Sequence, residues 1–182
     1  HILYGNELAI NAGDALHIIM WKMVSDINLP KITEEFYKML LRTTLGQAVE
    51  QIWTNKKTNI SEDQYFFVAD SKSAYYSVAG PMRLGAIASN ATAKQVDKIT
   101  EFGLHLGRCF QLVDDILDIE QDKKEGKSTL AITKGVDCAE KIIIECKNKA
   151  INIFNNDLKF LSHKLARKEL EELIYFIIER KY

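Results

Sequence analysis

The chain has 182 residues and a formal net charge of −1, with 47% apolar and 27% charged residues, so it is long enough to bury a sizeable core. The near-zero charge argues against a nucleic-acid-binding protein, which would carry a basic stripe, and no apolar run of about 18 residues predicts a membrane span. Only two prolines and nine glycines occur, which favours helices over a turn-rich β fold.

The first half of the chain is predicted to be helical, because its apolar residues recur with a period of 3.6 rather than in alternation. One helix is expected over residues 6–26, where the sequence NLP follows and stops it. A second is expected over residues 33–53, with Thr33 as its N-cap. A third is expected over residues 61–79, since the sequence SEDQ at its start is a capping box.

The second half shows the same helical period. Gly80-Pro81 is expected to kink or break the third helix. After it we expect a helical continuation through residue 89, a long helix from Thr92 to about residue 120, a loop with the sequence DKKEGKST, and two helices over residues 129–155 and 160–180. No strand pattern, repeat or low-complexity linker interrupts this order. We therefore predict an all-α fold in which residues 1–182 form one domain of helices packed side by side.

The segment QLVDDILDIEQD, residues 111–122, holds five acids and neither lysine nor arginine. Gln111 and four of the acids, at 114, 115, 118 and 122, fall on one stripe of a helix. One interpretation is a solvated acidic face. The other is a cation site, because neighbouring like charges, aspartates inside a helix and acids near its C-terminus all cost free energy. Short aspartates one turn apart suit Mg²⁺.

Two lysines are candidates for binding an anion. Lys72, in DSKSAYYSVAG, either reaches water along an apolar helix or binds phosphate inside a cavity. Lys127, in EGKST, follows the acidic stripe and could reach an anion held by metal ions there. That loop is not a P-loop, because the preceding glycines are missing. Gln47 and Glu50 form a polar pair one turn apart, which an exposed helix face explains equally well.

The histidines and cysteines show no metal-ligand spacing. We expect four structural or surface histidines, His1, His17, His105 and His163. The three cysteines form no CxxC pair and have no histidine pair near them, which indicates reduced thiols in a cytoplasmic protein.

Five segments, in order, resemble motifs of one family, the trans-isoprenyl diphosphate synthases or polyprenyl synthetases. They are ELAINAGDALH, LGQAVEQIW, ISEDQYFFVADSKSA, FGLHLGRCFQLVDDILD and EGKSTLAI. The fourth ends in FQxxDDxxD, the family's second aspartate-rich motif. The third carries Lys72-Ser73 where the family has Lys-Thr, and Glu50 stands where the family has an aspartate. The resemblance spans nearly the whole chain.

This resemblance implies a bundle of antiparallel helices around a deep central cavity. Mg²⁺ would assist the loss of diphosphate from an allylic diphosphate, leaving an allylic cation. The double bond of isopentenyl diphosphate would attack this cation, and loss of a proton would give a prenyl diphosphate one isoprene unit longer. The resemblance also implies a homodimer.

The site residues follow from the same motifs. Asp114, Asp115 and Asp118 would be the metal ligands. Lys72 and Lys127 would bind the diphosphate oxygens.

Other matched positions have supporting roles. Gln111 would line the cavity beside the cation, and Ser73 would offer its carbonyl or hydroxyl oxygen near it. Gly103 and Gly107, four residues apart, would allow close helix packing.

Two parts of the family pattern are missing. The first aspartate-rich motif and the basic residues that bind isopentenyl diphosphate would precede His1, and the loop after Asp118 is shorter than in the family. We expect that segments of a longer protein are omitted and that this chain alone does not catalyse the full reaction. One alternative is a non-catalytic subunit of a heteromeric synthase. Another is a class I terpene cyclase, against which the Lys-Ser and Gly-Lys-Ser-Thr elements argue.

Overall fold

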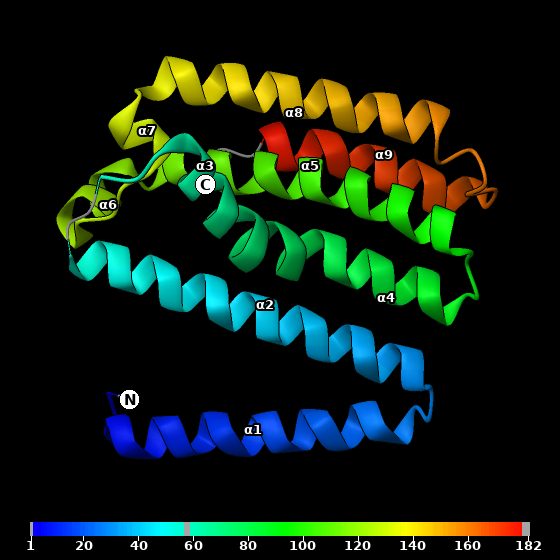
Figure 1. Cartoon of the computed structure of the whole chain (residues 1–182), viewed down its shortest axis with the longest axis horizontal. Helices are drawn as coiled ribbons and strands as arrows, with labels where there is room; N and C mark the ends of the chain where they lie inside the picture. The colour runs from blue at the N-terminus through cyan, green and yellow to red at the C-terminus, as the bar shows by residue number, and fades with distance from the viewer. Residues whose placement is uncertain (1, 57–58, 180–182) are drawn as a thin grey trace.

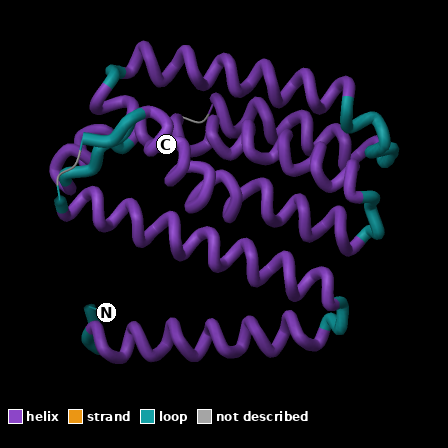
Figure 2. The backbone as a smooth tube through the Cα atoms, viewed as in Figure 1, coloured by secondary structure: helices purple, strands orange, loops and turns teal. Residues whose placement is uncertain are grey.

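All regular secondary structure in the described residues, 2–56 and 59–179, is helical (Figures 1 and 2). This computed structural model therefore confirms the predicted all-α class. In chain order the helices are α1 (Asn6–Asp26), α2 (Pro30–Asn55), α3 (Glu62–Val68), the π-helix η1 (Ala69–Ala79), α4 (Gly80–Ala88), α5 (Ala93–Leu117), α6 (Ile119–Glu125), α7 (Leu130–Thr133), α8 (Val136–Asn156) and α9 (Lys164–Glu179). Over these ranges, no helix is both long and apolar enough to cross a membrane.

The long helices lie roughly side by side and alternate in direction (Figure 1). Helix α1 forms one edge, followed by α2, then the continuous run of α3, η1 and α4, then α5, with α8 at the opposite edge. The turns from α1 to α2, from α4 to α5 and from α8 to α9 share one end of the bundle. At the other end, the last turns of α2 and α5 lie near α3, α6 and α7.

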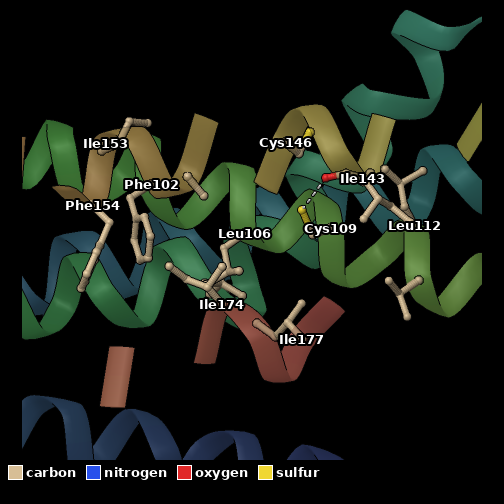
Figure 3. Packing of buried hydrophobic residues seen from close by; sticks show 14 of the residues in the cluster. Phe102, Leu106, Cys109, Leu112, Ile143, Cys146, Ile153, Phe154, Ile174 and Ile177 are labelled. Carbon is tan, nitrogen blue, oxygen red and sulfur yellow. Dashed lines mark hydrogen bonds between the residues drawn. The ribbon is translucent and has the colours of Figure 1, made fainter. Parts of the chain in front are cut away.

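The main apolar core lies where α5 packs against α8, η1 and α9 (Figure 3). Phe102 of α5 meets Phe154 of α8 with their ring centroids 5.9 Å apart, and both are almost fully buried. Helix α9 adds Ile174 and Ile177 beneath α5. Each such buried side chain stabilises the fold by roughly 1.5–3 kcal/mol, so this face fixes where α5 lies.

Several helix ends lie where the sequence predicts them. Helix α1 has the predicted bounds, and complete capping boxes begin α3 at Ser61 and α5 at Thr92. The expected N-cap at Thr33 is wrong, because α2 begins at Pro30. Proline fits the first turn of a helix, where its missing N–H would have no intrahelical partner.

The predicted third helix has the right length but changes type, since residues 69–79 form a π-helix. The chain stays helical through Gly80 and Pro81, where η1 gives way to α4, so of the predicted kink or break the break does not occur. The last element, expected over 160–180, is α9, which begins only at Lys164. Its expected end at residue 180 lies outside the described residues.

Between α5 and α8 the predicted boundaries are wrong. Helix α5 ends at Leu117 rather than near residue 120, and much of the expected loop DKKEGKST belongs to α6. Gly126, with φ 73°, ends α6 in the left-handed conformation that glycine adopts easily. Gly135, with φ 90°, divides the predicted helix 129–155 into α7 and α8.

Glycines on α5 let it approach η1 closely, as predicted. A Cβ atom on Gly107 would lie 2.4 Å from the Cα atom of Ala74, and one on Gly103 would lie 2.7 Å from that of Ala79. Both neighbours are backbone atoms of η1, which cannot turn aside. Gly46 of α2 meets η1 from the other side, where an added Cβ would lie 2.8 Å from Ser71 Cβ. The π-helix is therefore held between α2 and α5.

Substitution of Gly107 by alanine should lower the free energy of unfolding by about 1–3 kcal/mol, because overpacking forces the backbones of α5 and η1 apart. Gly85→Ala is the matched control. Nothing lies within 4 Å of a Cβ at Gly85, so this change should be neutral or stabilise by roughly 0.5–1 kcal/mol through helix propensity. Urea unfolding measures the free energy of unfolding of both variants. Equal changes in Gly107→Ala and Gly85→Ala would contradict the interpretation that Gly107 allows close packing.

Candidate functional site

A cavity of about 170 Å³ opens at the end of the bundle where α6 lies. Its walls come from the last turns of α2, from α3 and η1, from the last turns of α5 and from the segment after α6. It is lined by all seven site residues predicted from the sequence, Lys72, Ser73, Gln111, Asp114, Asp115, Asp118 and Lys127. Segments far apart in the chain thus bring the predicted set together.

The acidic stripe, which runs from the end of α5 into α6, is only partly solvated. Asp115 is only 3% exposed and Asp122 only 5%, while Asp114 is half-buried and Asp118 is exposed. The face points into the cavity because the opposite face of α5 carries the apolar core, including Leu112. The solvated interpretation is therefore wrong for the two buried acids.

Asp115 is held on both sides by donors of this chain. Tyr65 Oη donates to Asp115 Oδ2 at 2.6 Å, and Gln111 Nε2 donates to Oδ1 at 2.6 Å. Burial raises the pKa of Asp115 to about 6; these two hydrogen bonds oppose the rise, and the charges of Asp122 and Asp114 add to it. Burial and the charge of Asp115 likewise raise the pKa of Tyr65 well above its usual value.

Lys72 lies on η1 and faces the cavity rather than only bulk water. Its Nζ atom is 2.6 Å from Glu50 Oε2, and Gln47 Nε2 donates to the same oxygen at 3.3 Å. Glu50, which lines the cavity, is a further candidate site residue, whose placement the sequence interpretation left open. The pair Gln47 and Glu50 was the available signal, but helical spacing alone could not tell an exposed face from a cavity wall.

Lys127 lines the cavity from the segment after α6 and forms ion pairs with two acids. Its Nζ atom is 2.8 Å from Asp122 Oδ1 and 2.9 Å from Glu125 Oε2. Burial acts to lower the pKa of Lys127, but the hydrogen bonds to Asp122 and Glu125 outweigh it and raise the pKa above its ordinary value. Asp122, on the predicted stripe but not assigned to the site, thus positions a predicted anion-binding cation.

The acids that line the cavity suit Mg²⁺ by their chemistry. Asp114, Asp115, Asp118, Asp122 and Glu50 face two lysines there, so the cavity carries excess negative charge. Within the part of the chain that the structure describes, no three His, Cys, Asp or Glu side chains converge closely enough to hold a metal by themselves. Mg²⁺ rarely needs such a cage, because it binds through one or two carboxylates together with phosphate oxygens and water.

The described histidines do not line this cavity. His17 Nε2 accepts a hydrogen bond from Trp21 Nε1, and His163 Nδ1 accepts one from the backbone of Ala166. His105 is half-buried on α5. These placements agree with the expected structural or surface roles, and His1 lies outside the described residues.

A comparison with protein families matches residues 1–173 to the model described as Polyprenyl synthetase. The chain belongs to the polyprenyl synthetase family. Among related sequences, this family member is 30% identical to a geranylgeranyl diphosphate synthase of Sulfolobus acidocaldarius over 93% of its own residues and 53% of that relative. It is 28% identical to a farnesyl diphosphate synthase of Buchnera aphidicola over 98% of its residues and 58% of that relative.

Solved structures confirm the fold of this family member. A geranylgeranyl pyrophosphate synthetase from Geoglobus acetivorans superimposes with a TM-score of 0.86 at 21% identity, covering 99% of this chain and 69% of that one. A geranyltransferase from Helicobacter pylori gives a TM-score of 0.80 at 25% identity, covering 98% and 62%. The chain spans about half the length of the curated relatives it matches.

Proposed function

We propose that this chain is part of a Mg²⁺-dependent prenyltransferase that condenses isopentenyl diphosphate with an allylic diphosphate. The observation that carries the proposal is one cavity lined by carboxylates, two lysines and a glutamine from separate helices. The family membership and the names of the relatives, geranylgeranyl and farnesyl diphosphate synthases, support it.

In this proposal Asp114 and Asp118 hold the metal ion through their carboxylates. Mg²⁺, when bound, would neutralise the charge that builds up on the departing diphosphate. Asp115, the third ligand predicted from the sequence, has both oxygens engaged by Tyr65 and Gln111. It therefore shapes the site through these hydrogen bonds.

The two lysines bind the diphosphate oxygens. Lys72 and Lys127 approach the cavity from different walls, and each is already paired with a carboxylate of the chain. A diphosphate carries more negative charge than these partners, so it competes for the same ammonium groups. Charge stabilisation of this kind is stronger in a site shielded from water, because the local dielectric constant is low.

Two polar groups and the apolar wall serve the organic part of the substrate. Gln111 and Ser73 line the cavity beside Val68 and Trp53. Oxygen atoms of Gln111 and Ser73 would face the allylic cation, while the apolar side chains keep water away from it. Attack by the double bond of isopentenyl diphosphate and loss of a proton would then complete the condensation.

A non-catalytic subunit of a heteromeric synthase is the second candidate. A class I terpene cyclase fits less well, because the Lys-Ser element at Lys72 and the Gly-Lys-Ser-Thr element at Lys127 match the synthase motifs.

We also propose that residues 1–182 form one domain that assembles as a homodimer. Most of α1 is exposed, including the apolar side chains of Ile18 (70% exposed) and Met23 (66%), and such a face supports burial against another surface. The cysteines at 109, 138 and 146 are free thiols, which supports the proposed cytoplasmic location.

The test uses the protein encoded by the complete gene. Incubated with Mg²⁺, isopentenyl diphosphate and dimethylallyl, geranyl or farnesyl diphosphate in turn, it should give a product one isoprene unit longer with at least one of them. Absence of product with all three would reject the enzyme proposal and favour the subunit. Light scattering of the same preparation should give the mass of a dimer. The mass of a monomer would reject the proposed homodimer.

A further inference from the structure

A buried chain of hydrogen bonds joins α3 to the last turns of α5. Tyr65 Oη donates to one oxygen of Asp115, and Gln111 Nε2 donates to the other, each at 2.6 Å. Tyr65 is 6% exposed and Asp115 is 3% exposed. Tyr65 and Asp115 are fifty residues apart in the sequence, so tertiary packing alone brings them together.

The chemistry of Asp115 decides how the amide of Gln111 is turned. An ionised carboxylate accepts hydrogen bonds and cannot donate them, so the amide atom that faces Asp115 must be the NH₂ group. Gln111 lines the cavity, and its NH₂ group is bound to Asp115. Its carbonyl oxygen is therefore the polar atom that can interact with a ligand in the cavity.

We propose that Tyr65 is a positioning residue: through Asp115 it fixes the amide of Gln111 so that the carbonyl oxygen, and not the NH₂ group, faces the cavity. The inference rests on the proposed function, because the oriented carbonyl group would stabilise the allylic cation of that reaction. A carbonyl dipole stabilises a positive carbon and an NH₂ group repels it. Electrostatic stabilisation is most effective when the dipole is already oriented, so a flipped amide costs rate.

The proposal also gives Asp115 a role different from that of its neighbours. Both of its oxygens are occupied by the chain's own donors, whereas Asp118 is exposed at the cavity. Asp115 is therefore the anchor that joins Tyr65 to Gln111.

Tyr65→Phe removes only the hydroxyl group and is the principal test. The chain offers a matched control in Tyr75, whose Oη atom donates to Glu35 Oε1 at 2.6 Å. Both tyrosines are buried and bound to a buried carboxylate, but Tyr75 does not line this cavity. Tyr75→Phe therefore makes the same chemical change away from the site.

The first readout needs no activity. In ¹⁵N-labelled chain without metal, the side-chain NH₂ signals of Gln111, assigned by their loss in Gln111→Met, should shift and exchange faster with water in Tyr65→Phe. Tyr75→Phe should leave them in place. Unchanged signals in Tyr65→Phe, or equal shifts in both variants, would overturn the proposal.

The second readout is kinetic and uses the full-length enzyme. Tyr65→Phe should lower kcat about 10- to 100-fold with little change in either KM, because the diphosphates are bound by other groups. Tyr75→Phe should leave kcat unchanged. A normal kcat in Tyr65→Phe would refute the orienting role. If the wild type makes no product, the proposed function fails, and the amide signals alone decide whether Tyr65 orients Gln111.

Asp115→Asn covers the case in which Tyr65→Phe does not fold. Its amide can still accept from Tyr65 but presents an NH₂ group to Gln111, which should then flip and offer its own carbonyl in return. The Gln111 NH₂ signals should move toward those of a solvated amide. Signals that stay at the wild-type position would count against the proposal.

Discussion

Asp114→Ala in the full-length enzyme should lower the rate of prenyl transfer by about 10³-fold, since one group that stabilises charge in a transition state is worth that much when removed. Asp114 lines the cavity on the last turns of α5, next to Asp115 and Asp118. Its loss removes a carboxylate for Mg²⁺ but also relieves repulsion among neighbouring acids. The free energy of unfolding should therefore change little, because such repulsion disfavours the folded state.

The measurement combines a steady-state assay with urea unfolding of the same preparations. Asp97→Ala is the control, because Asp97 is exposed on the same helix and lies outside the cavity. This control should keep full activity. Titration of Mg²⁺ with inorganic diphosphate should show weaker binding in Asp114→Ala alone. An Asp114→Ala enzyme within tenfold of the wild type would refute the metal assignment.

Arg83→Met should cost about 3–5 kcal/mol of stability, because it leaves a buried carboxylate without its cation. Arg83 donates through Nε to Glu35 Oε1 at 2.7 Å and through Nη2 to Oε2 at 2.9 Å. Glu35 is only 4% exposed, and Tyr75 provides its third hydrogen bond. The pair ties α2 to α4.

The pH dependence of this effect has a definite sign. Burial acts to raise the pKa of Glu35, but the hydrogen bonds from Arg83 and Tyr75 outweigh it, and the pKa lies below its ordinary value. In the wild type, the stability that ionised Glu35 contributes is present above its pKa in the unfolded chain. This stability is lost as the pH falls through its lower pKa in the folded protein. In Arg83→Met burial dominates and raises the pKa, so ionisation near neutral pH destabilises the fold.

Urea unfolding at pH 7 and pH 4 checks this prediction. The deficit of Arg83→Met relative to the wild type should be largest at pH 7 and should shrink at pH 4, where Glu35 is protonated more easily. Lys22→Met is the control, because its partner Asp26 is exposed and surface ion pairs contribute little. A deficit that grows toward acid would contradict the proposed source of the stability.

Several features could be predicted because they are local. The capping boxes at Ser61 and Thr92 each satisfy backbone donors within four residues, so the sequence alone places these helix starts. Charge crowding on one stripe argued against a wholly solvated face, and the burial of Asp115 on α5 and Asp122 on α6 agrees with this, while the cation site stays a prediction. The start of α2 was missed because two rules compete there, a threonine cap and a proline at the first turn.

Other features depend on contacts across the fold. From the sequence alone, Glu50 could equally lie on an exposed helix face. In the structure, Lys72 Nζ on η1 lies 2.6 Å from Glu50 Oε2. From the sequence alone, Tyr65 would be assigned to the apolar core. The structure shows that its hydroxyl group donates a hydrogen bond to Asp115. The π-helical winding of residues 69–79 has no periodic signature distinct from an α-helix, and it is held by glycines of two other helices.

The sequence by itself determined the all-α class, most of the helices, the family and the residue types that meet in the cavity. These follow from apolar periodicity, capping and motif order, which act over a few residues at a time. Only the tertiary structure decided which acids are buried, which lysine faces which carboxylate and which way Gln111 is turned. Burial and hydrogen-bond partners are set by segments far apart in the chain, and one-dimensional spacing does not encode them.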